Sequence, residues 1–95
     1  MEKGYLIANI RVHDPVAFEE FKLLSQAAIA DYGGKVLARS ATPDYREGPN
    51  RGQVVLIEFE TPDVARAFYD STAYRAARDV REKIAQTDLV LVEGL

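Results

Sequence analysis

An α+β fold with the element order β-α-β-β-α-β is predicted for this chain by two recurring patterns. Apolar residues alternate at period two in some segments, as in strands, and recur every three or four positions in others, as in helices. An Asp-Pro or Thr-Pro pair precedes each helical region, as an N-cap followed by proline at the first helical position. The 95 residues show no linker or repeat, so a single domain over residues 1–95 is expected.

The first strand is expected at residues 4–13, GYLIANIRVH. One face of it is wholly apolar and should meet the helices: Leu6, Ala8, Ile10 and Val12. The other face is mixed: Tyr5, Ile7, Asn9, Arg11 and His13. Asp14 and Pro15 then open a helix of about 17 residues. Gly33 and Gly34 should end it, because glycine adopts left-handed conformations without a Cβ penalty.

A second strand at residues 35–40 and a third at residues 52–60 are expected on either side of a polar loop. The third strand should turn Val55, Ile57 and Phe59 towards the helices and Val54, Leu56 and Glu58 away from them. By the same alternation, the second strand should place Val36 and Ala38 against the helices and Leu37 and Arg39 on the opposite face.

The second helical region should begin at Pro62, and Ser71-Thr72 should bend or re-cap it. The helix that follows is expected to run to about Gln86, and residues 88–94 should form the fourth strand. Two split β-α-β units with right-handed crossovers then give a four-stranded antiparallel sheet of order 4-1-3-2, with helices on one face only.

The uncovered face predicts association of two copies. It would expose an apolar patch too large for a comfortable monomer, formed by Tyr5, Ile7, Leu37, Val54 and Leu56. A homodimer packed through the sheet faces would bury this patch. The gap left between sheets and helices would then be lined by Asn9, Arg11, His13, Arg39 and Glu58.

Composition excludes several classes of function. The net charge of −3 and the pI of about 5.1 oppose nucleic-acid binding. The strand order is shared with RNA-recognition domains, but Gln53, Val55 and Glu58 stand where their stacking aromatics would be. Without Cys and with one His, no metal site is expected, and no cofactor is predicted. The segment MEKGYLIANIRVHD resembles neither a signal peptide nor a membrane span, so a cytoplasmic protein is expected.

The chain resembles the domain of unknown function 1330 family, within the dimeric α+β barrel superfamily. The resemblance rests on KGYLIANI, DYGGKVLARS, Glu47-Gly48, VVLIEFETPDVARAFYDSTAY and the closing LVEG. It implies a homodimer of two ferredoxin-like sheets packed face to face. Superfamily members include cofactor-free oxygenases, isomerases and haem-handling enzymes that hold ligands between sheet and helices. On matching positions it implies cleft or loop roles for Arg39, Glu47, Glu58, Tyr74 and Arg81.

Arg39 and Glu58 come from adjacent predicted strands and form the first candidate site. The guanidinium could hold a carboxylate or enolate, while Glu58 serves as general base. The alternative is a cross-strand ion pair that only sets the register. His13 is a second acid–base candidate or a surface residue at a strand–helix corner.

Further candidate ligand contacts are Asn9 and Arg11 on the mixed face, and Glu47 in the long loop. That loop is either a lid or a dimer arm. Tyr74 belongs to the helical core or to a cleft. Arg81 beside it either pairs with a carboxylate of the chain or binds one of a ligand.

Three functions remain open at this point. The first is a cofactor-free enzyme that performs proton transfer or oxygenation on a small acidic or aromatic metabolite. The second is a module that binds a small molecule without converting it. The third is a dimeric domain whose polar gap is only structural. The choice among them depends on the site, since fold alone does not imply function.

Overall fold

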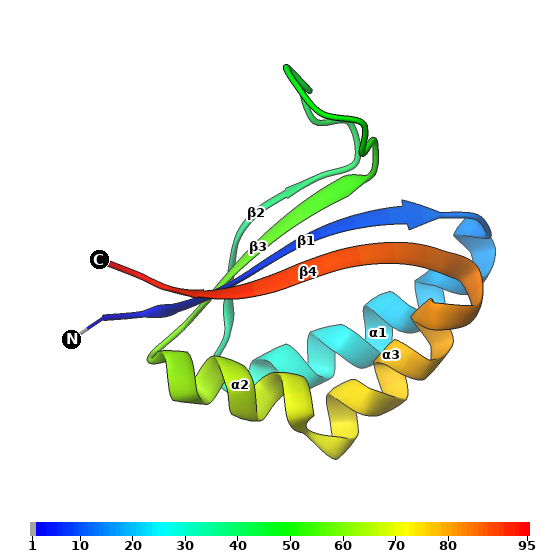
Figure 1. The fold of residues 1–95 in the computed structure, drawn as a ribbon. Coiled ribbons are helices and arrows are strands. Elements are labelled where there is room, and N and C mark those ends of the chain that lie inside the picture. Colours follow the sequence, from blue (N-terminus) through cyan, green and yellow to red (C-terminus); the bar gives the residue numbers. More distant parts are fainter. Residues whose placement is uncertain (1) are drawn as a thin grey trace.

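One sheet of four antiparallel strands is covered on one face by helices (Figure 1). The computed structural model describes residues 2–95. Its elements in chain order are β1 (Gly4–Val12), α1 (Pro15–Asp31), β2 (Lys35–Ser40), β3 (Gln53–Phe59), α2 (Pro62–Asp70), α3 (Thr72–Ile84) and β4 (Ala85–Glu93). The strand order β2-β3-β1-β4 is the predicted order, and the ferredoxin-like arrangement is confirmed. The molecule measures 37 × 32 × 16 Å, thin enough for one sheet and one layer of helices.

The helices begin where the capping residues predict. The side chain of Asp14 accepts from the amide of Ala17 at 3.1 Å, and Pro15 opens α1. Thr61 caps α2 through the amide of Val64, also at 3.1 Å. Ser71 separates α2 from α3: its hydroxyl accepts from the amide of Tyr74 at 3.1 Å. The second helical region is therefore two helices, and the re-cap expected at Ser71 is confirmed.

The two glycines after α1, Gly33 and Gly34, have different structural roles. Gly33 has a φ of 66°, the left-handed conformation expected at a helix end. Gly34 is needed for space instead. A Cβ there would lie 2.8 Å from side-chain atoms of both Ile29 and Phe59, so α1 and β3 could not approach so closely with any other residue.

The boundary between α3 and β4 differs from the prediction. The helix ends at Ile84 rather than near Gln86, and β4 starts at once with Ala85 in extended conformation. Pairing with β1 accounts for the difference: Ala85 lies opposite Val12, and the amide of His13 donates to the carbonyl of Ile84 at 2.7 Å. Ladder hydrogen bonds outweigh the helical preference of these residues.

The core lies between the sheet and the helices. As predicted, β1 turns Leu6, Ala8 and Ile10 into it, and β3 adds Ile57 and Phe59. Aromatic rings join the layers: Phe68 of α2 lies 4.9 Å from Phe59 and 4.4 Å from Tyr74 of α3, centroid to centroid. These contacts hold α2 and α3 against the middle of the sheet.

A β-bulge in β2 reverses the predicted direction of Ala38 and Arg39. Val36 lies opposite Ile57 as expected, but the register then shifts, and Leu37 is the extra residue. Ala38 is therefore opposite Leu56, on the face away from the helices, and Arg39 is opposite Val55, on the helix side. The prediction that Arg39 shares a face with Glu58 is wrong. A single inserted residue flips every later side chain to the other face.

The sheet face away from the helices, here called the open face, carries exposed apolar side chains. Ile7 lies between Leu56 of β3 and Val90 of β4 in the ladder register. The exposed fractions are 39% for Ile7, 44% for Leu37, 53% for Val90 and 41% for Val92. Within residues 2–95, no helix is long and apolar enough to cross a bilayer.

Candidate functional site

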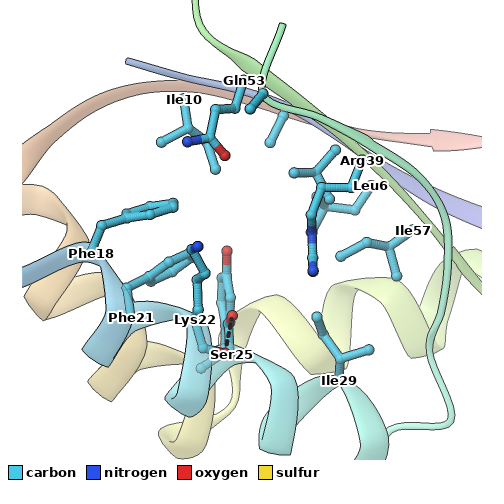
Figure 2. A pocket seen from close by; sticks show the side chains of 14 residues that line it. Leu6, Ile10, Phe18, Phe21, Lys22, Ser25, Ile29, Arg39, Gln53 and Ile57 are labelled. Carbon is cyan, nitrogen blue, oxygen red and sulfur yellow. Dashed lines mark hydrogen bonds between the residues drawn. The ribbon is translucent and has the colours of Figure 1, made fainter. Parts of the chain in front are cut away.

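A cavity of about 290 Å³ lies between the sheet and the helices (Figure 2). In Figure 2, Arg39 and Gln53 enter it from the strands, and Phe18 borders it from α1. The lining residues are Leu6, Ala8, Ile10, Phe18, Phe21, Lys22, Ser25, Ile29, Arg39, Ala41, Gln53, Val55, Ile57 and Tyr74. Most of the wall is thus apolar, and its polar side chains are Lys22, Ser25, Arg39, Gln53 and Tyr74.

Local structure explains how each polar group reaches the cavity. The bulge at Leu37 turns Arg39 inward, as described above. Lys22 and Ser25 lie three residues apart on α1, on the turn that follows Phe18 and Phe21. The hydroxyl of Ser25 donates to the carbonyl of Lys22 at 3.2 Å, which keeps it on the helix surface.

Arg39 is the cation of the cavity that has no internal partner. Lys22 forms an ion pair with Glu19 at 3.0 Å, one turn back on α1. For Arg39, no hydrogen bond or ion pair to another residue of the range 2–95 is formed. Arg39 is exposed, so its guanidinium donors face solvent and are accessible to a bound group.

A more open groove of about 380 Å³ adjoins the cavity and shares Ile10, Phe18, Lys22, Ala41 and Gln53 with it. Arg11 and Arg51 also line this groove, against one carboxylate, Glu19. Two of the groove's three cations are paired, Arg11 with Asp88 and Lys22 with Glu19. Arg51 forms no ion pair within residues 2–95, so it is the cation of the groove that can attract an anion.

Tyr74 supplies a buried hydroxyl on the α3 side. It is 4% exposed, and its oxygen accepts from Nη1 of Arg81 at 2.8 Å. Burial raises the pKa of the Tyr74 phenol, and the nearby Arg81 cation opposes this effect only in part. The phenol is therefore neutral at neutral pH and can donate a hydrogen bond, but it cannot act as a base.

No carboxylate and no imidazole lines the cavity. Glu58 projects instead on the open face, where the hydroxyl of Tyr5 donates to its Oε2 at 3.1 Å. That hydrogen bond, followed by burial, raises the pKa of Tyr5. Arg39 and Glu58 thus lie on opposite faces of the sheet, and the predicted pair does not form.

The other predicted residues separate in the same way. His13 is exposed at the corner between β1 and α1 and lines none of the hollows described here. Glu47 is exposed in the loop after β2, which projects away from the helices in Figure 1. Five polar residues were expected around one gap. Arg39 lines the cavity and Arg11 lines the adjoining groove. The other three, Asn9, His13 and Glu58, line neither.

Asn9 and Arg11 take part in a polar network on the open face. Arg11 donates to Asn9 at 2.7 Å and pairs with Asp88 at 3.3 Å. Asn9 donates to the hydroxyl of Tyr45 at 2.6 Å, and this hydroxyl also bonds both backbone groups of Gly52. The network thereby ties the long loop to the ends of β1 and β3.

Lys22, Ser25 and Gln53 are site residues that the sequence reasoning missed. Lys22 and Ser25 interrupt an apolar helical stripe, and this was the available signal. Gln53 opens the third strand and carried no such signal. Within residues 2–95, no three His, Asp or Glu residues cluster closely enough to hold a metal ion.

Comparison of the sequence with known families gives one match. The model of a family described as a domain of unknown function, DUF1330, matches residues 3–95. No curated protein matches the sequence significantly.

Solved structures confirm the fold. A protein of unknown function from Rhodopseudomonas palustris is similar with a TM-score of 0.76 and 18% identity, over 98% of this chain and 82% of that one. A dimeric ferredoxin-like protein of unknown function from Bacteroides fragilis has a TM-score of 0.64 and 15% identity, over 96% and 95%. A cofactor-independent oxygenase from Streptomyces nogalater has a TM-score of 0.68 and 16% identity, over 97% and 92%. At these identities the likeness concerns the fold alone.

Proposed function

We propose that this chain, a member of the DUF1330 family, forms a homodimer. Each subunit would bind a small aromatic acid in the cavity that contains Arg39. The observation that carries the proposal is the exposed Arg39 guanidinium, which has no partner among residues 2–95 and borders a largely apolar wall. A ligand with a negative group and an apolar ring satisfies both features at once.

The size and charge of the cavity restrict the ligand. A volume of about 290 Å³ is at the small end of ligand pockets, which favours a compound of one ring with short substituents. Phe18 and Phe21, whose rings stack on each other with centroids 5.2 Å apart, give the α1 side of the cavity an aromatic wall. Arg39 takes the negative group, and Arg51 in the adjoining groove adds a second cation without an ion pair among residues 2–95.

The cavity favours chemistry in which the ligand itself is the acid. The residues lining the cavity include no carboxylate or imidazole, the side chains that most often act as general base, and the one amine among them, Lys22, is paired with Glu19. The Arg39 cation stabilises an ionised enol or phenol and so lowers its pKa, and bulk water accepts the proton. The neutral Tyr74 phenol can donate a hydrogen bond to the bound anion. Such an electron-rich anion can also react with dioxygen, and one protein of similar fold is a cofactor-independent oxygenase.

Binding without conversion is the second candidate function. It is favoured by the same absence of a carboxylate or imidazole from the cavity wall. Turnover of the bound compound in air, followed by oxygen uptake and by product mass, separates the two candidates.

Thermal melting with benzoate as the probe tests the proposal. Because benzoate binds the folded state, it should raise the melting temperature of the wild-type protein in a concentration-dependent way. Arg39→Met should weaken benzoate binding by about tenfold to a hundredfold, the loss expected for a hydrogen bond to a charged group. Glu58→Gln is the matched control and should bind as the wild type does, because Glu58 lies on the other face. Loss of binding in Glu58→Gln with retention in Arg39→Met would refute the site.

The homodimer rests on the open face. Leu56, Ile7 and Val90 form an apolar row across β3, β1 and β4. A similar fold from Bacteroides fragilis is described as dimeric. Packing two open faces removes the exposed row from water, which stabilises the pair by the hydrophobic effect. In that arrangement the loop that carries Glu47 reaches towards the second copy.

A further inference from the structure

A buried cation on α3 has no carboxylate partner. Arg81 is 4% exposed, and it forms no ion pair with any residue of the range 2–95. Its guanidinium lies 5.3 Å from the centre of the Phe21 ring, and its Nη1 donates to Tyr74. The rings and the C-terminal end of α3 attract the positive charge. They do not supply acceptors for the remaining N–H groups, which a buried guanidinium needs.

Arg81 borders a hollow of about 280 Å³, here called the α3 hollow. It is formed by residues from the ends of α2 and α3 and from β4: Tyr69, Arg81, Glu82, Ala85, Thr87 and Leu89. It shares no lining residue with the cavity that contains Arg39. The hydrogen bond from Arg81 to Tyr74 links the two, since Tyr74 lines that cavity and Arg81 lines the hollow.

Several polar atoms at the α3 hollow are enclosed without a partner. Nε of Arg81 and Oγ1 of Thr87 have no hydrogen bond within the described residues. Arg78 is close by: its guanidinium lies 4.2 Å from the Tyr69 ring centre and donates to the Tyr69 hydroxyl at 2.9 Å. The Nε of Arg78 is also enclosed and unpaired. Two of these unsatisfied groups belong to residues that line the hollow, Arg81 and Thr87, and leaving buried polar groups unpaired destabilises a folded core.

The charges around the hollow favour an anion. The Arg81 guanidinium lies in the wall, and a second guanidinium, that of Arg78, is stacked on the wall residue Tyr69. The one carboxylate in the wall is Glu82, which is exposed and pairs with neither arginine. A planar guanidinium with free N–H groups matches the oxygens of a carboxylate or a sulfate-like group.

We propose that the α3 hollow is a second binding site, for a small oxyanion, in which Arg81 and Thr87 supply the hydrogen bonds. The anion neutralises the buried Arg81 charge. This site is independent of the proposed function, because it uses none of the residues of the Arg39 cavity.

Backbone amide NMR of the full chain, titrated with sodium acetate and with sodium sulfate, tests the second site. Ionic strength is held constant with sodium chloride, which is also the control titration. Acetate or sulfate should produce saturable shifts at residues 81–89. A response to acetate assigns a carboxylate ligand, and a response to sulfate a tetrahedral one. No saturable shift at residues 81–89 with either salt overturns the proposal.

Two variants keep the test independent of folding. Thr87→Val preserves shape and removes the hydroxyl, and it should weaken anion binding by about threefold to tenfold. Arg81→Met should abolish the shifts, and the folded variant should no longer gain melting temperature from the anion. Arg39→Met should leave the shifts at residues 81–89 unchanged. If Arg39→Met abolishes them and Thr87→Val does not, the anion binds in the other cavity and the α3 hollow is not a site.

Discussion

Arg39 and Glu58 show how strongly function at the residue scale depends on which face of a strand a side chain occupies. Their residue types predicted an acid–base pair, and their strands are indeed neighbours. The bulge places the guanidinium in the cavity and leaves the carboxylate on the open face with Tyr5. The residues that line the cavity therefore include the Arg39 cation but no carboxylate or imidazole, which changes the expected chemistry from base catalysis to stabilisation of an anion.

The Tyr74 hydroxyl should matter for stability, because it is the one acceptor that Arg81 has among residues 2–95. Tyr74→Phe should lower the free energy of unfolding by about 1–3 kcal/mol, since the buried cation loses this partner. The control is Tyr32→Phe, whose half-buried hydroxyl makes no hydrogen bond within those residues; its effect should stay within about 0.5 kcal/mol. Urea denaturation measures both. Equal losses would contradict the role given to the Tyr74 hydroxyl.

The same residue gives the unfolding free energy a pH dependence. Burial raises the pKa of Tyr74 above its ordinary value of 10.0, so the folded state favours the neutral phenol. Its contribution is complete below pH 10.0 and declines as the pH rises towards the folded-state pKa. The difference in unfolding free energy between wild type and Tyr74→Phe should accordingly shrink in alkaline urea titrations.

Some of the site could be predicted from residues and some could not. Tyr74 and Arg81 were singled out by their place on an apolar helical stripe, and the structure brings them into contact. The direction of Arg39 could not be obtained by counting, since alternation assumes an unbroken strand. His13 was chosen for its titration range, a property that says nothing about where the side chain lies.

At the scale of elements, the sequence predicts helix starts correctly because a capping residue and its hydrogen-bond partner lie close together in the chain. Asp14, Thr61 and Ser71 each cap a helix through a side chain three residues from its amide partner. The end of α3 depends on pairing of Ala85 with the distant Val12, and nothing near Gln86 in the chain indicates it. The bulge in β2 likewise depends on its fit to β3, a contact between segments separated by the long loop.

Disulfide trapping tests the register of β2. The chain contains no Cys, so any disulfide that forms must join the two introduced cysteines. The double variant Ala38→Cys with Leu56→Cys should cross-link on oxidation, because these residues are direct partners across the bulged ladder. Ala38→Cys with Val55→Cys is the pair that an unbroken strand would join, and it should remain reduced. Thiol counting after oxidation measures both, and the reverse result would restore Arg39 to the open face.

At the scale of the whole molecule, one face of the sheet is left uncovered by helices. The open face exposes Ile7, Leu37, Val90 and Val92, while the helices already cover the other face. Helix α1 also exposes large apolar side chains, Val16 at 85% and Leu23 at 69%, but they stand on a helix rather than in a row across strands. The sheet face is therefore the expected interface.

Ile7→Glu should dissociate the dimer, because it would place an unpaired carboxylate at the centre of the buried face. Val16→Glu is the control and should leave the assembly intact, since Val16 is already 85% exposed on α1. Sedimentation velocity should give twice the chain mass of 10.6 kDa for wild type and Val16→Glu, and 10.6 kDa for Ile7→Glu. A monomeric wild type would rule out the sheet-face interface.

Isoleucine methyl NMR with benzoate tests the central claim most directly, because the isoleucines mark both faces of the sheet. Ile10, Ile29 and Ile57 line the cavity, and Ile7 lies on the open face. The account predicts saturable benzoate shifts at Ile10, Ile29 and Ile57, with Ile7 unchanged and the shifts lost in Arg39→Met. Shifts confined to Ile7 would contradict it, since the ligand would then lie on the Glu58 side.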